Sequence, residues 1–100
     1  MKLYALIGID RPNAIERRDE IRTEHRAYVQ SHKDRIRIAG AFLNDDGAQI
    51  GSLIVFEADD PEYVWDWIRN EPFYMDGIYA HVDVRLWGVS MGGIATDIPV

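Results

Sequence analysis

The sequence predicts an α+β domain in which four strands form an antiparallel sheet and two helices cover one of its faces. Three observations support this prediction. The chain has 100 residues, of which 47% are hydrophobic, which suits a single domain with one modest core. Two short segments are apolar throughout, two others alternate apolar and polar residues, and two longer segments between them have helical periodicity. In chain order these segments are β-α-β-β-α-β.

The first predicted strand and helix occupy residues 3–32. Residues 3–9 form a continuous apolar run that is too short for a typical helix, which predicts a strand buried on both faces. After a break at residues 10–13, Asn13 and Glu16 have the spacing of a helix N-cap and its capping-box partner. We expect a helix from there to about His32. The side chains expected on its inward side are Ala14, Ile21, His25 and Tyr28.

The second and third predicted strands are joined by a turn. In residues 35–42 the side chains of Ile36, Ile38 and Phe42 alternate with more polar or smaller ones, which predicts a strand with one less-buried face. Residues 44–47 (NDDG) have turn composition. Residues 53–56 (LIVF) are apolar at every position, which predicts a second strand buried on both faces.

The second predicted helix begins at Asp60, a capping residue followed by proline, and ends near Asn70. Because Pro72 disfavours helical conformation at Glu71, we expect residues 72–79 to form a short turn-like connection. Residues 81–87 then alternate between two faces, which predicts the last strand. One face carries Val82, Val84 and Leu86, and the other carries His81, Asp83 and Arg85.

This order is the ferredoxin-like arrangement, in which the first and third strands are central and the second and fourth are edges. The two strands predicted to be apolar on both faces are the central ones. Two helices cover only one face of such a sheet, so the apolar residues of the other face need a cover. A second subunit is the simplest cover. The alternative is that the C-terminal tail, residues 89–100, folds back over the sheet of the domain, which comprises residues 1–88.

Charge and composition exclude several classes of protein. The net charge of −6 leaves no basic stripe for a phosphate backbone, so we expect no nucleic-acid partner. The absence of cysteine excludes disulfides and thiolate metal sites. No apolar stretch approaches the roughly 20 residues that span a bilayer, and residues 1–10 lack signal-peptide features. We therefore expect a cytoplasmic protein without a membrane partner.

His25 and Glu71 are the residues that point to chemistry. His25 lies on the inward side of the first helix, and histidine exchanges protons near neutral pH. Arg22, one turn earlier, can hold an anion, although a surface ion pair is the alternative. Glu71 can orient an imidazole, or it is a surface residue at a helix end. A structural, hydrogen-bonded histidine is the alternative for His25, and we expect His25→Ala to be near-neutral in stability because Arg22 indicates a polar cavity there.

A metal site is not expected. His81 and Asp83 lie two residues apart on one face of the last strand, but there is neither a third ligand nor a known ligand spacing. Cross-strand ion pairs on a polar edge strand explain these residues better. We also expect no cofactor, because the scattered glycines after the last strand do not form a phosphate-binding loop.

Several short motifs follow each other in a fixed order: residues 22–28 (RTEHRAY), 39–42 (AGAF), 45–47 (DDG), 51–54 (GSLI) and 70–73 (NEPF), followed by Gly77 and Tyr79. In their order and spacing these motifs resemble the YCII-related (YciI-like) family, and the resemblance covers residues 2–88. It implies a dimeric α/β barrel with a helix histidine, here His25, and an acidic residue before Pro-Phe in the active site. The family's usual acidic residue is aspartate, so Glu71 either reaches His25 differently or does not pair with it. One branch of the family is a dehydrochlorinase acting on a chlorinated hydroxyquinol, and muconolactone isomerase shares the broader fold.

Together these features predict a cofactor-independent acid-base enzyme of lyase or isomerase type. Its substrate would be a small cyclic metabolite that is oxygenated or anionic. We expect His25 to move the proton, Glu71 to orient the imidazole, and Arg22, Tyr28 and Phe73 to bind the substrate. The alternatives are a non-catalytic dimeric module that binds a small molecule, and an accessory protein without pocket chemistry.

Overall fold

The structure, a computed structural model, describes residues 1–92. Its elements are β1 (Lys2–Asp10), α1 (Ile15–Glu20), α2 (Arg22–Ser31), β2 (Ile36–Leu43), β3 (Gln49–Ala58), α3 (Pro61–Arg69), α4 (Pro72–Met75) and β4 (Tyr79–Trp87). Most of the predicted tail, and with it the alternative that the tail covers the sheet, lies outside the described residues.

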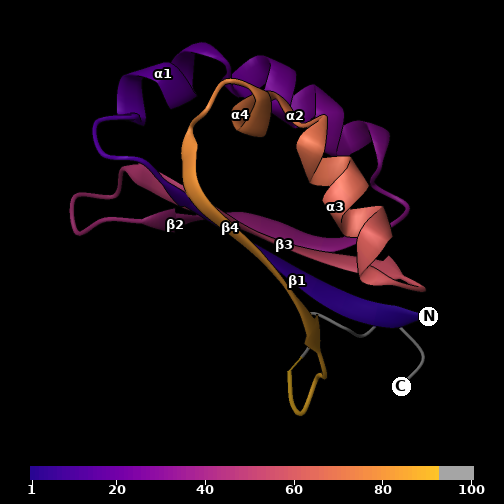
Figure 1. Cartoon of the computed structure of the whole chain (residues 1–100). Helices are drawn as coiled ribbons and strands as arrows, with labels where there is room; N and C mark the ends of the chain where they lie inside the picture. The colour runs from indigo at the N-terminus through magenta and orange to yellow at the C-terminus, as the bar shows by residue number, and fades with distance from the viewer. Residues whose placement is uncertain (93–100) are drawn as a thin grey trace.

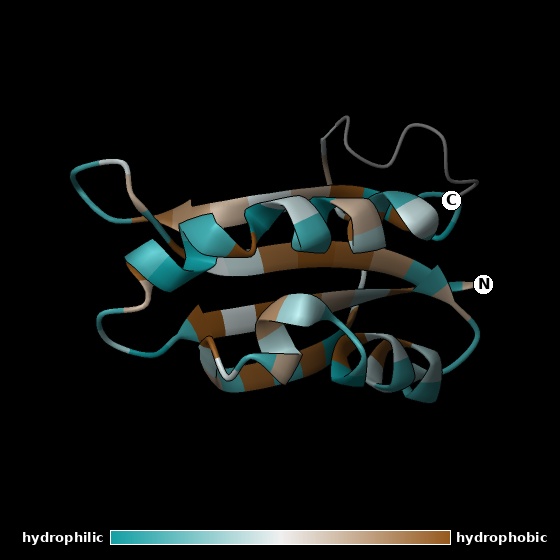
Figure 2. Ribbon diagram, turned by 90° about the horizontal axis from the view of Figure 1, so that it is seen from above, coloured by the Kyte–Doolittle hydropathy of each residue, from teal (hydrophilic) through white to brown (hydrophobic). Residues whose placement is uncertain are grey.

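The four strands form one antiparallel sheet in the order β2-β3-β1-β4. The central strands are therefore β1 and β3, as predicted, and β2 and β4 are the edges. All helices lie on one face of the sheet (Figures 1 and 2). This confirms the predicted fold class, the α+β ferredoxin-like architecture of the dimeric α/β barrel proteins.

The core lies between the central strands and α3. Tyr4 and Leu6 of β1 and Ile54 and Phe56 of β3 point toward the helices and are almost fully buried. They pack against the buried residues of α3, which are Val64, Trp67 and Ile68. Burial of each large side chain of this kind contributes about 1.5–3 kcal/mol. The alternate residues of β1 and β3 face the opposite side of the sheet, which none of the helices within residues 1–92 covers (Figure 1).

The first predicted helix differs from the expectation in two ways. Asn13 is not its N-cap, because Asn13 has a left-handed backbone (φ 63°) and Ala14 occupies the cap position without a side-chain bond. The helix is also interrupted at Ile21 into α1 and α2. The backbone bonds from Ile21 N to Arg17 O and from His25 N to Ile21 O continue across the break. Residues spaced along the inward side of α1 and α2 therefore still share one side.

Strand β2 contains an irregularity that the alternation of its residues did not reveal. Ile36 pairs with Phe56, but Ile38 pairs with Val55, so one extra residue is inserted between them. An extra residue moves all later side chains to the opposite face. The prediction that Ile36 and Ile38 share a face is therefore wrong. The bulge turns the small residues Ala39 and Ala41 toward the helices, which leaves space beneath α2.

The predicted connection at residues 72–79 contains a single-turn helix, α4, and β4 begins at Tyr79 instead of His81. Pro72 stands at the first position of α4, where its missing N–H costs nothing. Glu71 is the N-cap, and its side chain accepts a hydrogen bond from the Tyr74 N–H at 3.2 Å. This local arrangement directs the Glu71 carboxylate back toward α2.

Candidate functional site

The structure pairs His25 of α2 with Glu71. Nδ1 of His25 is hydrogen-bonded to Oε1 of Glu71, and the other carboxylate oxygen caps α4. The Glu71 side chain is fully buried, whereas the His25 side chain is 15% exposed. The extra methylene of glutamate is thus accommodated and the pair is made. The alternative that Glu71 is a surface residue at a helix end is wrong.

This pair has the geometry of an acid-base site. With Nδ1 on the carboxylate, Nε2 is the ring nitrogen that remains to exchange a proton. A buried carboxylate at Nδ1 holds the tautomer and stabilises the imidazolium that forms when Nε2 takes up a proton. His25 also lines a cavity, so a bound molecule has access to it.

Phe73 holds the imidazole in place. Its fully buried ring stacks on His25 with 3.9 Å between centroids and 11° between planes. The guanidinium carbon of Arg18 lies 4.4 Å from the centroid of the same ring. Because each face of a phenyl ring accommodates one planar group, we place Phe73 between His25 and Arg18. The plane of the imidazole is therefore set by packing as well as by Glu71.

Arg18 is a site residue that the sequence analysis did not single out. It is only 3% exposed, and four hydrogen bonds hold its guanidinium group. The acceptors are Oδ2 of Asp10, Oε1 of Gln49, the carbonyl of Gly51 and Oγ of Ser52. A signal was present, because Arg18 follows Ala14 by four residues and precedes Ile21 by three, on the predicted inward side.

Ser52 connects Arg18 to a buried tyrosine. Its Oγ accepts hydrogen bonds from Nη2 of Arg18 at 2.6 Å and from the hydroxyl of Tyr79 at 2.9 Å. Burial, together with the nearby Glu71 charge, raises the pKa of Tyr79 well above its usual value, so the phenol stays neutral. Gly8 makes room for this ring, since a Cβ there would lie 2.7 Å from Cε1 of Tyr79.

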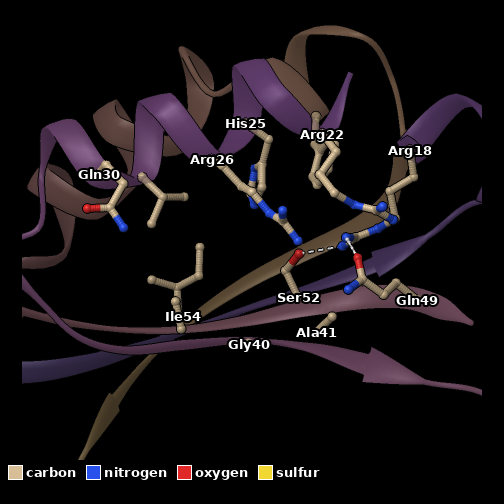
Figure 3. Close-up of a pocket in the computed structure, with 13 residues that line it drawn as sticks. Arg18, Arg22, His25, Arg26, Gln30, Gly40, Ala41, Gln49, Ser52 and Ile54 are labelled. Carbon is tan, nitrogen blue, oxygen red and sulfur yellow. Dashed lines mark hydrogen bonds between the residues drawn. The ribbon is translucent and has the colours of Figure 1, made fainter. Parts of the chain in front are cut away.

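The cavity lies between α2 and the strands β2 and β3 (Figure 3) and has a volume of about 470 Å³, within the size range of small-molecule sites. Its helix side carries Arg18, Arg22, His25 and Arg26. Its sheet side is formed by small residues of β2 and by Ser52 and Ile54 of β3. The cavity is therefore polar and cationic near Ser52 and apolar near Ile54.

Arg22 and Tyr28 have different surroundings. Arg22 lines the cavity and makes an ion pair with Asp19. The hydroxyl of Tyr28 donates to the carbonyl of Trp67 at 2.8 Å, and the two rings lie 4.9 Å apart. Burial raises the pKa of Tyr28. Tyr28 does not line the cavity, and its contacts join α2 to α3.

Of the five predicted site residues, the structure therefore brings His25, Glu71 and Phe73 into direct contact and places Arg22 in the same cavity. It gives Tyr28 a packing position instead. Their roles in catalysis and binding remain predictions.

The described residues contain no group of three side chains that could hold a metal ion. Asp83 accepts a hydrogen bond from Nε of Arg85 at 2.7 Å, and both residues lie on β4. The cross-strand ion pair that we expected here is therefore replaced by a pair within one strand. Within residues 1–92, none of the helices has the length and hydrophobicity of a transmembrane segment.

Comparison with known proteins places this geometry in a family. The family model of the YCII-related domain matches residues 2–88. The proteins named YciI from Escherichia coli O6:H1 and from Shigella flexneri are each 31% identical to this chain, with 83% of this chain and 93% of the relative covered.

Solved structures agree. The 5-chloro-2-hydroxyhydroquinone dehydrochlorinase TftG from Burkholderia phenoliruptrix, in complex with 2,5-dihydroxybenzoquinone, superposes with a TM-score of 0.79 and 28% identity. The superposition covers 86% of this chain and 93% of TftG. An antibiotic biosynthesis monooxygenase with 14% identity and a TM-score of 0.55, covering 91% of this chain and 100% of its own, shares the fold. The chain belongs to the YCII-related domain family.

Proposed function

We propose that this protein is a cofactor-independent acid-base enzyme of lyase or isomerase type that acts on a small cyclic, oxygenated or anionic compound. One observation carries this proposal. A fully buried carboxylate, Glu71, holds the imidazole of His25 at the wall of a cavity large enough for a single ring. Buried carboxylates are costly unless they are paired, so a pair of this kind beside a cavity is a candidate for function.

In the proposed reaction Nε2 of His25 removes a proton from the bound ring. The electron pair left behind moves through the ring and expels a leaving group such as chloride, or is reprotonated at another atom in an isomerisation. Glu71 stabilises the imidazolium meanwhile, and Arg22 offsets negative charge on the substrate. In the elimination the net change is loss of one proton and one chloride ion, so no oxidant or cofactor is required.

The similarity to TftG supports a ring substrate of this class. TftG is named for dehydrochlorination of a chlorinated hydroxyhydroquinone, and the molecule bound to it is a six-membered oxygenated ring. Because the identity is 28%, we extend only the reaction class and the size of the substrate from TftG to this chain, as a proposal. The cavity volume of about 470 Å³ suits such a ring.

A ligand screen followed by product analysis tests the proposal. The panel contains 5-chloro-2-hydroxyhydroquinone, 2,5-dihydroxybenzoquinone and small unsaturated lactones, and binding is detected as a rise in melting temperature. Each compound that binds is then incubated with wild type and with His25→Asn, and products and released chloride are measured. We expect turnover by wild type alone. Recovery of every bound compound unchanged would overturn the enzyme proposal and leave a binding module.

We further propose that the protein is a homodimer or a higher homo-oligomer that associates through the open face of the sheet. The apolar residues that line this face include Ile7, Ile38, Phe42, Leu53, Val55 and Trp87. They line a groove of about 660 Å³, and Trp87 is 38% exposed. A contiguous apolar face of this kind is typical of an interface.

The variant Leu53→Asp is expected to be monomeric, because it places a charge at the centre of the proposed interface, on the central strand β3. Sedimentation velocity at micromolar concentration measures the effect. Met75→Asp, which introduces the same charge at a 70% exposed position on α4, is the matched control and should sediment like wild type. A wild-type monomer without dye-binding apolar surface would contradict the proposal.

A further inference from the structure

Three guanidinium groups converge on one end of the cavity. Arg18, Arg22 and Arg26 follow each other at intervals of four residues. Figure 3 shows Arg18 and Arg26 extending from the helices toward Ser52, and Arg22 extending toward Arg18. The chain as a whole carries a net charge of −6. Concentration of positive charge in one small cavity of an acidic protein raises the local concentration of anions there.

The three arginines are not equally neutralised. Arg18 is fixed by Asp10 and three further acceptors. Arg22 has a partner at its Nη2 in Asp19, which is 57% exposed. Its Nε is buried and has no hydrogen-bond partner within residues 1–92. The Arg26 side chain is exposed, lines the cavity, and makes neither a hydrogen bond nor an ion pair with any residue from 1 to 92. The Arg26 guanidinium is therefore an available donor beside two cations, Arg18 and Arg22, that already have partners.

Ser52 supplies a further donor. A hydroxyl group has two acceptor lone pairs and one proton. The lone pairs of Ser52 Oγ receive bonds from Arg18 and Tyr79, and no acceptor for its proton is found within the described part of the chain. Accepting two hydrogen bonds makes the hydroxyl a stronger donor. Because Ser52 lines the cavity, that donor is available to a bound molecule.

We infer that Ser52 and Arg26, with the charge of Arg22 beside them, form an oxyanion subsite that holds an ionised carboxylate or phenolate oxygen of the substrate. The inference rests on the proposed function and narrows its substrate class from oxygenated or anionic rings to ionised ones. His25, on the same helix as Arg22 and Arg26, then acts on a neighbouring atom of the ring. Arg18 serves as the anchor that orients Ser52.

Two pairs of ring compounds that differ in charge test the subsite. Benzoate is compared with benzamide, and 4-nitrophenolate with 4-nitroanisole, by NMR titration of the full chain. We expect at least one ionised compound to bind about tenfold more tightly than its uncharged partner, as charge-assisted hydrogen bonds imply. Preference within the first pair indicates a carboxylate, and preference within the second a phenolate. Equal affinities in both pairs, or no binding of any compound at millimolar concentration, would overturn the inference.

Variants of the cavity residues show which side chains cause the preference for ionised compounds. Arg26→Gln and Ser52→Ala should each remove most of it, whereas Arg69→Gln, an exposed arginine paired with Asp66 on α3, should keep it. Because Arg26 is exposed and unpaired within the described chain, Arg26→Gln should fold like wild type, which a melting curve checks. A preference unchanged in both cavity variants would refute the subsite.

A further variant separates this inference from the proposed function. His25→Asn should lose turnover but retain the preference for the ionised compound. If the protein preferred ionised compounds but turned over no compound in the screen, only the proposed function would be contradicted. If it showed turnover but no preference for ionised compounds, only the subsite would be contradicted.

Discussion

Replacement of Arg18 by methionine is expected to lower the free energy of unfolding by about 3 to 5 kcal/mol, the usual cost of removing one partner of a buried ion pair. The Arg18 and Asp10 side chains are only 3% and 4% exposed, so the variant leaves the Asp10 carboxylate buried without its partner. Gln49 and Ser52 also lose a donor. Denaturant unfolding measures the loss.

The dependence of this loss on pH gives a second readout. Burial already raises the pKa of Asp10, and the Arg18 charge opposes that rise. Without Arg18 the pKa of Asp10 rises further, so the folded state binds a proton more readily than the unfolded state does. Stability of the variant relative to wild type should therefore recover as the pH falls.

Two variants control the experiment. Arg17→Met removes a neighbouring arginine whose ion pair with Asp76 is exposed, and its effect should be much smaller. Asp10→Asn in the Arg18→Met background removes the stranded charge and should recover part of the stability. If Arg17→Met and Arg18→Met lowered the free energy of unfolding equally, the buried ion pair would contribute no more to stability than the exposed one.

Replacement of His25 by alanine is expected to have two effects. Activity should fall by about 10² to 10⁴-fold, the usual contribution of a general acid-base residue. Stability should fall by about 1 to 3 kcal/mol, because among the described residues the buried Glu71 carboxylate then keeps only the Tyr74 N–H as a partner. This expected loss of stability differs from the near-neutral effect that the sequence predicted. That prediction took account of the polar cavity but not of the buried carboxylate behind the imidazole.

A background variant isolates the source of the stability loss. In Glu71→Gln the buried group carries no charge, so adding His25→Ala should cost less than it does in wild type. His81→Ala, an exposed histidine on β4, is the matched control and should leave stability and activity unchanged. A near-neutral His25→Ala would mean that Glu71 is accommodated without its partner.

The central strands and the inward position of His25 could be predicted because they depend on local pattern. The apolar runs at residues 3–9 and 53–56 have no polar side, so they belong at the centre of the sheet whatever the rest of the chain does. The period of a helix places His25 on the inward side without knowledge of its partner. These predictions required no information about distant residues.

The burial of Glu71 and Arg18 could not be predicted in the same way. Glu71 is buried because α4 turns its carboxylate toward a helix 46 residues earlier in the chain. Arg18 is buried because two strands supply its acceptors, up to 34 residues away. A charged residue considered alone is expected at the surface, and only the tertiary fold identifies the partners that make burial possible. The bulge after Ile36 likewise depends on how β2 pairs with β3.

The rates of wild type, His25→Asn, Glu71→Gln and the double variant, measured with the substrate identified by the screen, test the central claim most directly. If His25 and Glu71 act as one acid-base unit, each single variant lowers kcat strongly and the double variant is about as slow as His25→Asn alone. Independent contributions would instead make the double variant slower by the product of the two single effects. That product, or a His25→Asn variant as fast as wild type, would contradict the account.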